Sequence, residues 1–178
     1  MTPASGTSTA AAEPIELYLI RHGLAAERGD AWPDDSKRPL THKGIARLRR
    51  EAAALNHLGV SFDQILSSPL VRARQTAEVL ADGLATRPPL AVVEALSPGA
   101  TAAQAIEELG KHARRKRIAL VGHEPNMGEL AARLIGARGP FEFKKGAICR
   151  IDVDTLPPAR PGRLRWFASP KMLRAMRR

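Results

Sequence analysis

The sequence has few of the features that mark disulfide-rich, membrane-spanning or nucleic-acid-binding proteins. A single cysteine, Cys149, excludes an internal disulfide framework and a zinc site built on several cysteines, and it indicates a reducing compartment. No apolar run reaches the length of about 18 residues that a membrane-spanning helix needs. Aromatic residues make up only 4% of the chain, and no recognised nucleic-acid-binding motif is present.

The amino-terminal segment is not expected to be a secretory signal. Residues 1–14 contain neither a basic segment nor a long apolar segment, so they do not resemble a secretory signal peptide. Their Ala, Ser, Thr and Pro content predicts a flexible tail. Residues 15–178 are expected to form one domain, because this length suits a single core. Together with the single cysteine, these observations predict a cytoplasmic protein.

Positive charge is present in excess. Lys and Arg total 28 and Asp and Glu total 18, so the formal net charge is +10. Such a surplus suits nucleic acid, acidic protein partners or phosphorylated substrates. The basic run 114–117 motivates one alternative, a nucleic-acid-binding module without catalysis. The low aromatic content argues against it, and a basic run before a strand is usually a solvated turn.

Apolar runs and helical periodicity alternate along the chain. This alternation predicts an α/β fold, a three-layer α/β/α sandwich with a mainly parallel central sheet and helices on both faces. Strands are expected at 15–20, 64–66, 90–93, 118–121, 147–153 and 164–168. Three helices are expected to follow the capping residues Thr41, Ser68 and Thr101, and the second of them is expected to run from Val71 to about Leu84. A fourth helix is expected to start at Pro125, and a last one in the basic tail, residues 171–178. Residues 24–40 are expected to form a loop.

Unusual polar residues follow three of the expected strands. They are Arg21-His22-Gly23, Ser67-Ser68 with Arg72 shortly after, and Gly122-His123. Because the carboxyl ends of parallel strands meet at one edge of a sheet, we expect these segments to converge. Two histidines and two arginines without a carboxylate cluster form a cationic pocket that suits a phosphate. The spacing suits a metal poorly, so no metal site is expected.

Each residue of this pocket has a chemical reason to be there. Neutral imidazole at His22 is a competent nucleophile toward a phosphoryl group. The guanidinium groups of Arg21 and Arg72 offer planar forks of donors that match phosphate oxygens. Arg72 falls in the first turn of its helix, where the helix dipole also favours an anion. Ser68 is interpreted as the cap of that helix, with Pro69 as its first residue.

Several segments in the same order match a known family. In these segments the sequence resembles the histidine phosphatase superfamily, which has the phosphoglycerate mutase-like fold, and within it the small SixA-type phosphohistidine phosphatases. The resemblance spans roughly residues 15–173. The matching segments are LYLIRHG at 17–23, RPLTHKG at 38–44, SSPLVRARQTAEVL at 67–80, LVGHEPNMGELAARLI at 120–135, KKGAICRIDVD at 144–154 and RWFASPKML at 165–173.

The resemblance implies a role for each pocket residue. His22 would be the nucleophile that becomes phosphorylated, and Arg21 and Arg72 would bind the phosphoryl oxygens. His123 would complete the phosphate pocket and stabilise the developing charge. Neither a metal nor another cofactor is implied. The candidate general acid is Glu94, in a Glu-x-Leu-x-Pro pattern that resembles the SixA branch.

Other polar residues receive plainer interpretations. Glu124 is expected to complement the dipole at a helix start, and Asn126 is a weaker candidate for lining the site. The remaining histidines are expected to be exposed on helices, at His42, His57 and His112.

The short chain bears on the substrate. Only 51 residues separate Arg72 from His123, and they already hold a helix and a strand, so little remains for a lid. An open pocket admits a phosphorylated side chain on a protein, and the resemblance therefore implies a protein phosphohistidine phosphatase. A small phosphoester or a nucleotide would also enter and is the main alternative. A pseudoenzyme that binds phosphorylated ligands without turnover is disfavoured by the intact set of pocket residues.

Overall fold

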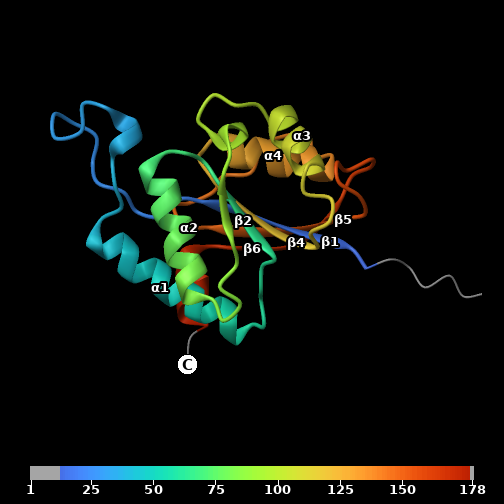
Figure 1. Ribbon diagram of the computed structural model, residues 1–178, viewed down its shortest axis with the longest axis horizontal. Helices are drawn as coiled ribbons and strands as arrows, with labels where there is room; N and C mark the ends of the chain where they lie inside the picture. Colours follow the sequence, from blue (N-terminus) through green and yellow to red (C-terminus); the bar gives the residue numbers. More distant parts are fainter. Residues whose placement is uncertain (1–12, 177–178) are drawn as a thin grey trace, which may run out of the picture.

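The computed structural model describes residues 13–176, so most of the predicted tail 1–14 lies outside the described part. A six-stranded sheet in the order β3-β2-β4-β1-β5-β6 forms the centre (Figure 1). Strands β1 to β4 are mutually parallel, and β5 and β6 are antiparallel, which confirms a mainly parallel sheet. The strands are β1 (Ile15–Arg21), β2 (Gln64–Ser67), β3 (Leu90–Val92), β4 (Arg117–Gly122), β5 (Ile148–Val153) and β6 (Arg163–Ala168).

Helices cover both faces of this sheet, as the alternation predicted (Figure 1). One face carries α1 (His42–His57), α2 (Val71–Gly83) and α5 (Pro170–Ala175), and the other carries α3 (Ala102–Gly110) and α4 (Asn126–Ile135). Two 3₁₀ turns, η1 (Asp35–Lys37) and η2 (Glu94–Leu96), lie in the connections. Within the described residues, no helix is long and apolar enough to cross a membrane.

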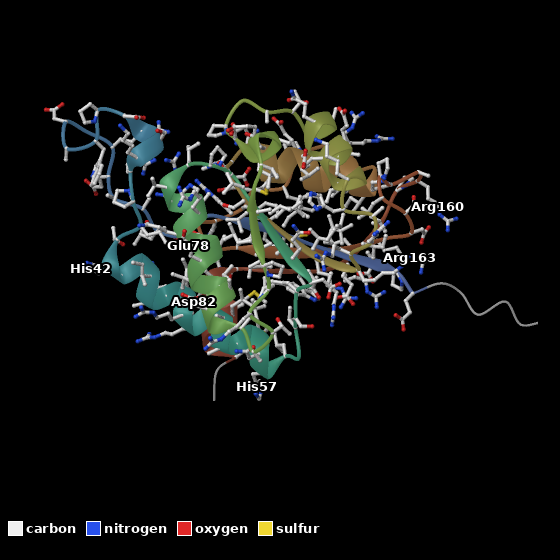
Figure 2. All side chains as sticks on the ribbon, viewed as in Figure 1. His42, His57, Glu78, Asp82, Arg160 and Arg163 are labelled. Atoms are coloured by element: carbon white, nitrogen blue, oxygen red, sulfur yellow. The ribbon has the colours of Figure 1, made fainter. Side chains whose placement is uncertain are left out.

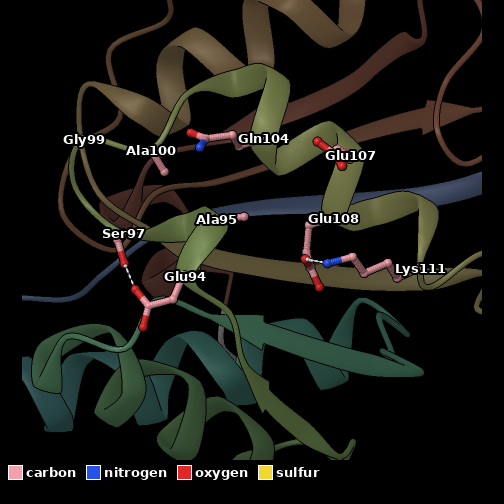
Figure 3. Close-up of a pocket in the computed structure, with 9 residues that line it drawn as sticks. All are labelled: Glu94, Ala95, Ser97, Gly99, Ala100, Gln104, Glu107, Glu108 and Lys111. Atoms are coloured by element: carbon pink, nitrogen blue, oxygen red, sulfur yellow. Dashed lines mark hydrogen bonds and ion pairs between the residues drawn. The ribbon is translucent and has the colours of Figure 1, made fainter.

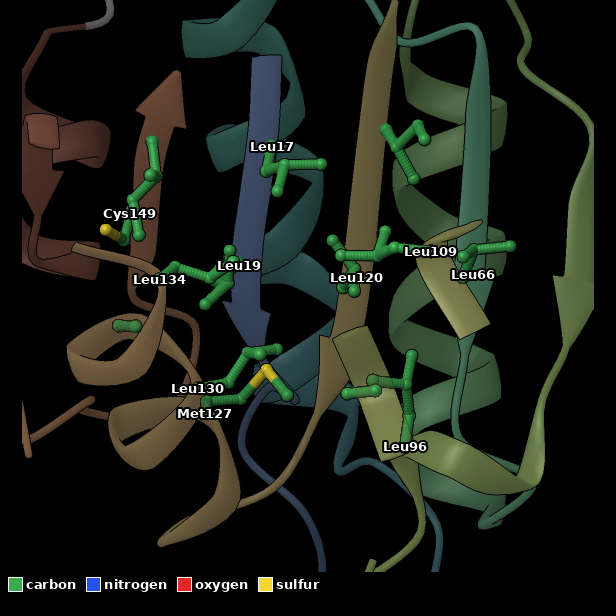
Figure 4. Close-up of a cluster of buried hydrophobic side chains, with 14 of the residues drawn as sticks. Leu17, Leu19, Leu66, Leu96, Leu109, Leu120, Met127, Leu130, Leu134 and Cys149 are labelled. Atoms are coloured by element: carbon green, nitrogen blue, oxygen red, sulfur yellow. The ribbon is translucent and has the colours of Figure 1, made fainter. Parts of the chain in front are cut away.

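Strand β1 contributes to both apolar layers because successive side chains of a strand point to opposite faces. Leu17 and Leu19 pack on the α3 and α4 side, and Figure 4 shows Leu19 beside Leu134. The alternate residues Tyr18 and Ile20 pack on the α1 and α2 side. A strand buried on both faces accounts for the continuous apolar run in the sequence.

The register of the sheet brings three strand ends together. Arg21 at the end of β1 lies opposite Gly122 at the end of β4. Ser67 at the end of β2 lies opposite Val121 of β4. The segments that follow these strands therefore emerge side by side at one edge of the sheet.

Helix starts follow the predicted capping chemistry in two cases and depart from it in a third. Thr41 accepts a hydrogen bond from Gly44 N–H at 2.9 Å, and Thr101 forms the predicted capping box with Gln104. For α2 the predicted range from Val71 to about Leu84 is confirmed, but the predicted cap is wrong. Leu70, not Ser68, precedes the helix, and no side chain caps it. The hydroxyl of Ser68 contacts a histidine of the pocket and accepts a hydrogen bond from Leu70 N–H.

Candidate active site

Three strand ends deliver the predicted pocket residues to one place. His22 N–H bonds to Gly122 O at 3.0 Å, and Ser68 N–H bonds to Val121 O at 3.0 Å, so the sheet ladder continues one residue past each strand. The rings of His22 and His123 lie 5.1 Å apart between centroids. Both rings and the Arg72 side chain are buried, although all three carry polar groups.

The hydrogen bonding of His22 leaves one ring nitrogen free. Its Nδ1 lies 2.8 Å from Gly23 O. A carbonyl oxygen only accepts, so the proton resides on Nδ1 and the lone pair on Nε2. Burial, together with the charges of Arg72 and Arg21 and the neighbouring His123 ring, lowers the pKa of His22 to about 3. The ring is therefore neutral at physiological pH, as a nucleophile must be.

In both predicted arginines, terminal Nη atoms donate hydrogen bonds to the protein, while Nε has no partner. Arg21 donates from Nη1 to Phe143 O at 2.6 Å. Arg72 donates from Nη1 to the Asp35 carbonyl oxygen at 2.8 Å and from Nη2 to Asp35 Oδ2 at 3.0 Å. The Nε atoms of both arginines are buried without a hydrogen-bond partner. Burial lowers the pKa of each guanidinium, although an arginine remains a cation in proteins.

His123 is held by a serine that the sequence analysis interpreted only as a helix cap. His123 Nε2 lies 2.7 Å from Ser68 Oγ, and its Nδ1 is buried without a partner. Burial, and next the charge of Arg72, lowers the pKa of His123 to about 4. The sequence signal for this contact was the position of Ser68 directly after a strand, the same signal that identified both histidines.

Asp35 is a site residue that the sequence analysis missed. It lies in η1, within the expected loop 24–40, and its carboxylate pairs with Arg72, with Arg38 at 2.9 Å and with Arg28 at 3.2 Å. Burial opposes ionisation, but the hydrogen bond from Arg38 and the nearby positive charges hold the pKa of Asp35 below its usual value.

The loop that carries Asp35 also forms a shallow hollow beside the pocket. Its volume is about 530 Å³, and its lining includes the half-buried indole of Trp32 together with Arg28 and Asp35. Through Asp35 this hollow adjoins the guanidinium of Arg72.

Among the described residues, no hydrogen bond or ion pair joins Glu94 to any of the four pocket residues. Its exposed carboxylate accepts a hydrogen bond from Ser97 Oγ at 3.0 Å (Figure 3). It lines a separate hollow of about 430 Å³ with Glu107 and Glu108. A role for Glu94 as general acid stays a prediction.

The remaining histidines divide into two groups. His42 and His57 are exposed at the two ends of α1, as expected (Figure 2). The prediction for His112 is wrong, because it follows the end of α3 and is half-buried. Its ring nitrogens lie 3.1 Å from Gln64 Oε1 and 3.4 Å from Glu108 Oε1.

Asn126 and the basic run have structural contacts. The Asn126 amide donates to Ser97 O at 3.3 Å and to Ala100 O, so it fastens the connection after η2. In the basic run, Arg117 pairs with Asp63 at 2.8 Å, and the other three residues are exposed, as expected for a solvated turn. No group of three or more His, Cys, Asp or Glu residues that could hold a metal ion occurs between residues 13 and 176.

Comparison with known proteins assigns the family. A family model described as the histidine phosphatase superfamily (branch 1) matches residues 17–97. Phosphohistidine phosphatase SixA of Escherichia coli (strain K12) is 32% identical over 171 residues, which cover 91% of this chain and 100% of that protein. The chain belongs to the histidine phosphatase superfamily. The resemblance of the motifs to that family is thereby confirmed.

Two further proteins are similar to this histidine phosphatase. An uncharacterised protein of Picosynechococcus is 44% identical over 119 residues, 66% of this chain and 71% of that protein. The structure of the protein histidine phosphatase SixA complexed with tungstate matches with a TM-score of 0.79 and 28% identity, over 88% of this chain and 98% of that one. The protein is thus a SixA-like phosphatase.

Proposed function

We propose that this phosphatase removes the phosphoryl group from a phosphohistidine on a protein, through a phosphorylated His22. One observation carries the proposal. Arg21 Nε, Arg72 Nε and His123 Nδ1 are all buried without a partner around a neutral His22. A buried polar atom without a hydrogen bond costs roughly 1–3 kcal/mol, so an oxyanion that accepts from these groups would be stabilised.

The proposed phosphoryl oxygen sets the tautomer of His123. A phosphoryl oxygen only accepts hydrogen bonds, so the ring hydrogen of His123 must lie on Nδ1 in the complex. His123 Nε2 then accepts from the hydroxyl of Ser68, 2.7 Å away, while Leu70 N–H donates to the same hydroxyl oxygen at 3.3 Å. In the proposed complex the Nδ1–H of His123 donates to a phosphoryl oxygen beside the two guanidinium groups.

In the first proposed step, the His22 Nε2 lone pair attacks phosphorus. A nitrogen–phosphorus bond forms to His22, and the bond from phosphorus to the substrate imidazole breaks. The leaving nitrogen takes up a proton from a water molecule of the surrounding solvent. Arg21, Arg72 and His123 bind the three equatorial phosphoryl oxygens while the charge on these oxygens redistributes. Such electrostatic stabilisation is the main contribution of a protein to phosphoryl transfer.

In the second proposed step, water replaces His22 on phosphorus. The water oxygen forms a bond to phosphorus, the nitrogen–phosphorus bond breaks, and the electron pair returns to His22 Nε2. The products are inorganic phosphate and the neutral ring of the free enzyme. All positive charge comes from the chain itself, so the proposed reaction needs no metal ion.

The chain between the second and third pocket segments supports a large substrate. The structure uses residues 71–122 for α2, β3, α3 and β4, which belong to the three layers, and for η2 and short connections between them. No long insertion is left in that interval to close over a small molecule. Without such a cover from this interval, a side chain on the surface of another protein suits the pocket. The single cysteine, Cys149, supports the cytoplasm as the proposed compartment.

The first prediction tests the nucleophile. His22→Ala is expected to abolish both turnover and incorporation of labelled phosphate, because no other neutral ring has a free Nε2 in the pocket. The exposed His57→Ala serves as the matched control and is expected to retain both. Normal hydrolysis of a phosphohistidine protein by His22→Ala would exclude the mechanism.

A substrate panel tests the leaving group on the wild-type chain. It compares a phosphohistidine protein, phosphoramidate, a sugar phosphate and an aryl phosphate. We expect the highest kcat/KM for the phosphohistidine protein. A higher kcat/KM for the sugar phosphate would instead assign the pocket to small phosphoesters.

A further inference from the structure

Glu124 makes contacts that a simple helix-start charge does not require. It follows His123 directly and precedes α4. Its Oε2 accepts a hydrogen bond from Gly128 N–H in the first turn of α4 at 3.3 Å, which agrees with the predicted dipole role. Its Oε1 accepts a hydrogen bond from Phe143 N–H, in a segment far along the chain. The carboxylate therefore joins the start of α4 to residues 139–147.

Phe143 in turn holds an arginine of the pocket. Its carbonyl oxygen accepts the 2.6 Å hydrogen bond from Arg21 Nη1. The N–H and the carbonyl of Phe143 lie on either side of its Cα, and the buried ring fixes the residue between them. That ring packs edge-on against Phe167, with 4.8 Å between ring centroids. A chain of direct contacts thus runs from Glu124 through Phe143 to Arg21.

The segment that contains Phe143 has no helix or strand of its own to hold it. Residues 139–147 precede β5 and are tied to the pocket by backbone hydrogen bonds. Gly146 N–H is shared between the carbonyl oxygens of Arg21 and His22, at 3.1 Å each. Glu124 adds to these backbone hydrogen bonds one from Phe143 N–H to a charged side chain. Its charge also acts directly on the Arg21 guanidinium, whose pKa it raises against the larger effect of burial.

We propose that Glu124 is a positioning residue for phosphoryl binding, which places the Arg21 guanidinium by anchoring the Phe143 backbone. The inference rests on the proposed function, because it assumes that Arg21 binds a phosphoryl oxygen. It assigns Glu124 no contact with substrate. Displacing the Phe143 carbonyl turns the fork of Arg21 away from the oxyanion and weakens its binding.

The two acceptor oxygens of Glu124 allow a series of variants that lose one or both of them. Glu124 accepts two backbone N–H groups, one with each oxygen. Glu124→Gln keeps one acceptor oxygen and directs an NH₂ group toward the other N–H. Glu124→Ala removes both acceptors. Glu129 lies in the first turn of the same helix and is exposed, so Glu129→Ala is the matched control.

The experiment measures tungstate binding by calorimetry on the full chain, with inorganic phosphate as a second probe. We expect Glu124→Ala to weaken tungstate binding about tenfold, Glu124→Gln to weaken it less, and Glu129→Ala to leave it unchanged. In an Arg21→Ala background, Glu124→Ala should weaken binding no further, because the two residues act on one contact. Circular dichroism and the unfolding midpoint identify the folded fraction of each variant, and Glu124→Gln serves if Glu124→Ala does not fold.

The outcomes separate this inference from the proposed function. Equal weakening by Glu124→Ala with and without Arg21 would overturn the positioning role while leaving the oxyanion site intact. Unchanged tungstate binding by folded Glu124→Ala would do the same. A wild-type chain that binds neither tungstate nor phosphate would overturn both the inference and the proposed phosphate pocket.

Discussion

At the scale of single residues, His22 shows how a backbone contact prepares a side chain for chemistry. The Gly23 carbonyl holds the ring proton on Nδ1, and burial among positive groups keeps the ring neutral. The same positive groups that lower its pKa are the ones proposed to bind the phosphoryl oxygens. One arrangement therefore prepares both the nucleophile and the site for its target.

The prediction at the scale of single residues concerns Ser68. Ser68→Ala removes the partner of His123 Nε2 and leaves a buried nitrogen free to change tautomer. We expect kcat/KM to fall about tenfold, in line with a lost buried hydrogen bond of about 1.4 kcal/mol. Steady-state kinetics on a phosphohistidine protein measures the effect. The control is Ser61→Ala, a half-buried serine whose hydroxyl accepts from Arg117 outside the pocket. An unchanged kcat/KM for Ser68→Ala would contradict the proposed tautomer of His123.

Residue partners were the least predictable part of the candidate site. Residue type and strand-end position were sufficient to single out His22 and His123. The contact between Arg72 and Asp35 was not predictable, because 37 residues separate them and the loop has no periodicity. The contact of Glu124 with Phe143 was not predictable either, because it joins two segments outside the helices and strands. Tertiary packing, rather than local pattern, decides such pairs.

At the scale of helices and strands, the sequence predicted most of the fold. Apolar runs located β1, β2 and β4, and their polar ends located the pocket. The cap of α2 was less predictable than its range. Pro69 after Ser68 is a common helix-start signal, yet the residue before the helix is Leu70 and no side chain caps it. Ser68 Oγ instead accepts from Leu70 N–H before the helix and contacts His123, a partner that the local sequence does not reveal.

Close packing of α4 on the segment after it provides a test at this scale. A Cβ on Gly128 would lie 1.9 Å from the Phe141 carbonyl oxygen, whereas one on Gly139 would meet no atom within 4 Å. Gly128→Ala is therefore expected to lower the free energy of unfolding by about 1–3 kcal/mol, because helix and segment must separate. Urea denaturation measures the change, and Gly139→Ala should be near neutral. Equal stability of the two variants would contradict the packing.

At the scale of the whole molecule, the buried pocket groups couple stability to pH. His22 and His123 have pKa values of about 3 and about 4 in the folded chain, below the ordinary 6.5. The unfolded chain therefore binds protons below pH 6.5 that the folded chain does not bind, so stability falls as the pH falls. Glu51, whose pKa burial raises to about 7, acts in the opposite direction between pH 7 and 4.5.

A variant isolates one of these contributions. Between pH 6.5 and 5, His123→Asn should lose less stability than the wild type, by about 2 kcal/mol, because one buried imidazole no longer resists protonation. The contribution of Glu51 cancels in this difference. Chemical denaturation at the two pH values measures it, and the exposed His57→Asn should follow the wild type. The same pH slope in His123→Asn would show that this ring titrates normally in the folded chain.

The loop that carries Asp35 gives the molecule an optical reporter of its own site. The chain holds two tryptophans, Trp32 in the hollow beside Asp35 and Trp166 in β6, whose ring lies 5.9 Å from that of Tyr18 in the core. Replacing Trp166 with phenylalanine leaves Trp32 as the sole indole. Since Asp35 bonds directly to the Nη atoms of Arg72, we expect an anion bound at Arg72 Nε to change the charge environment of that indole. A change of its emission on addition of tungstate would then report occupancy of the pocket without any label.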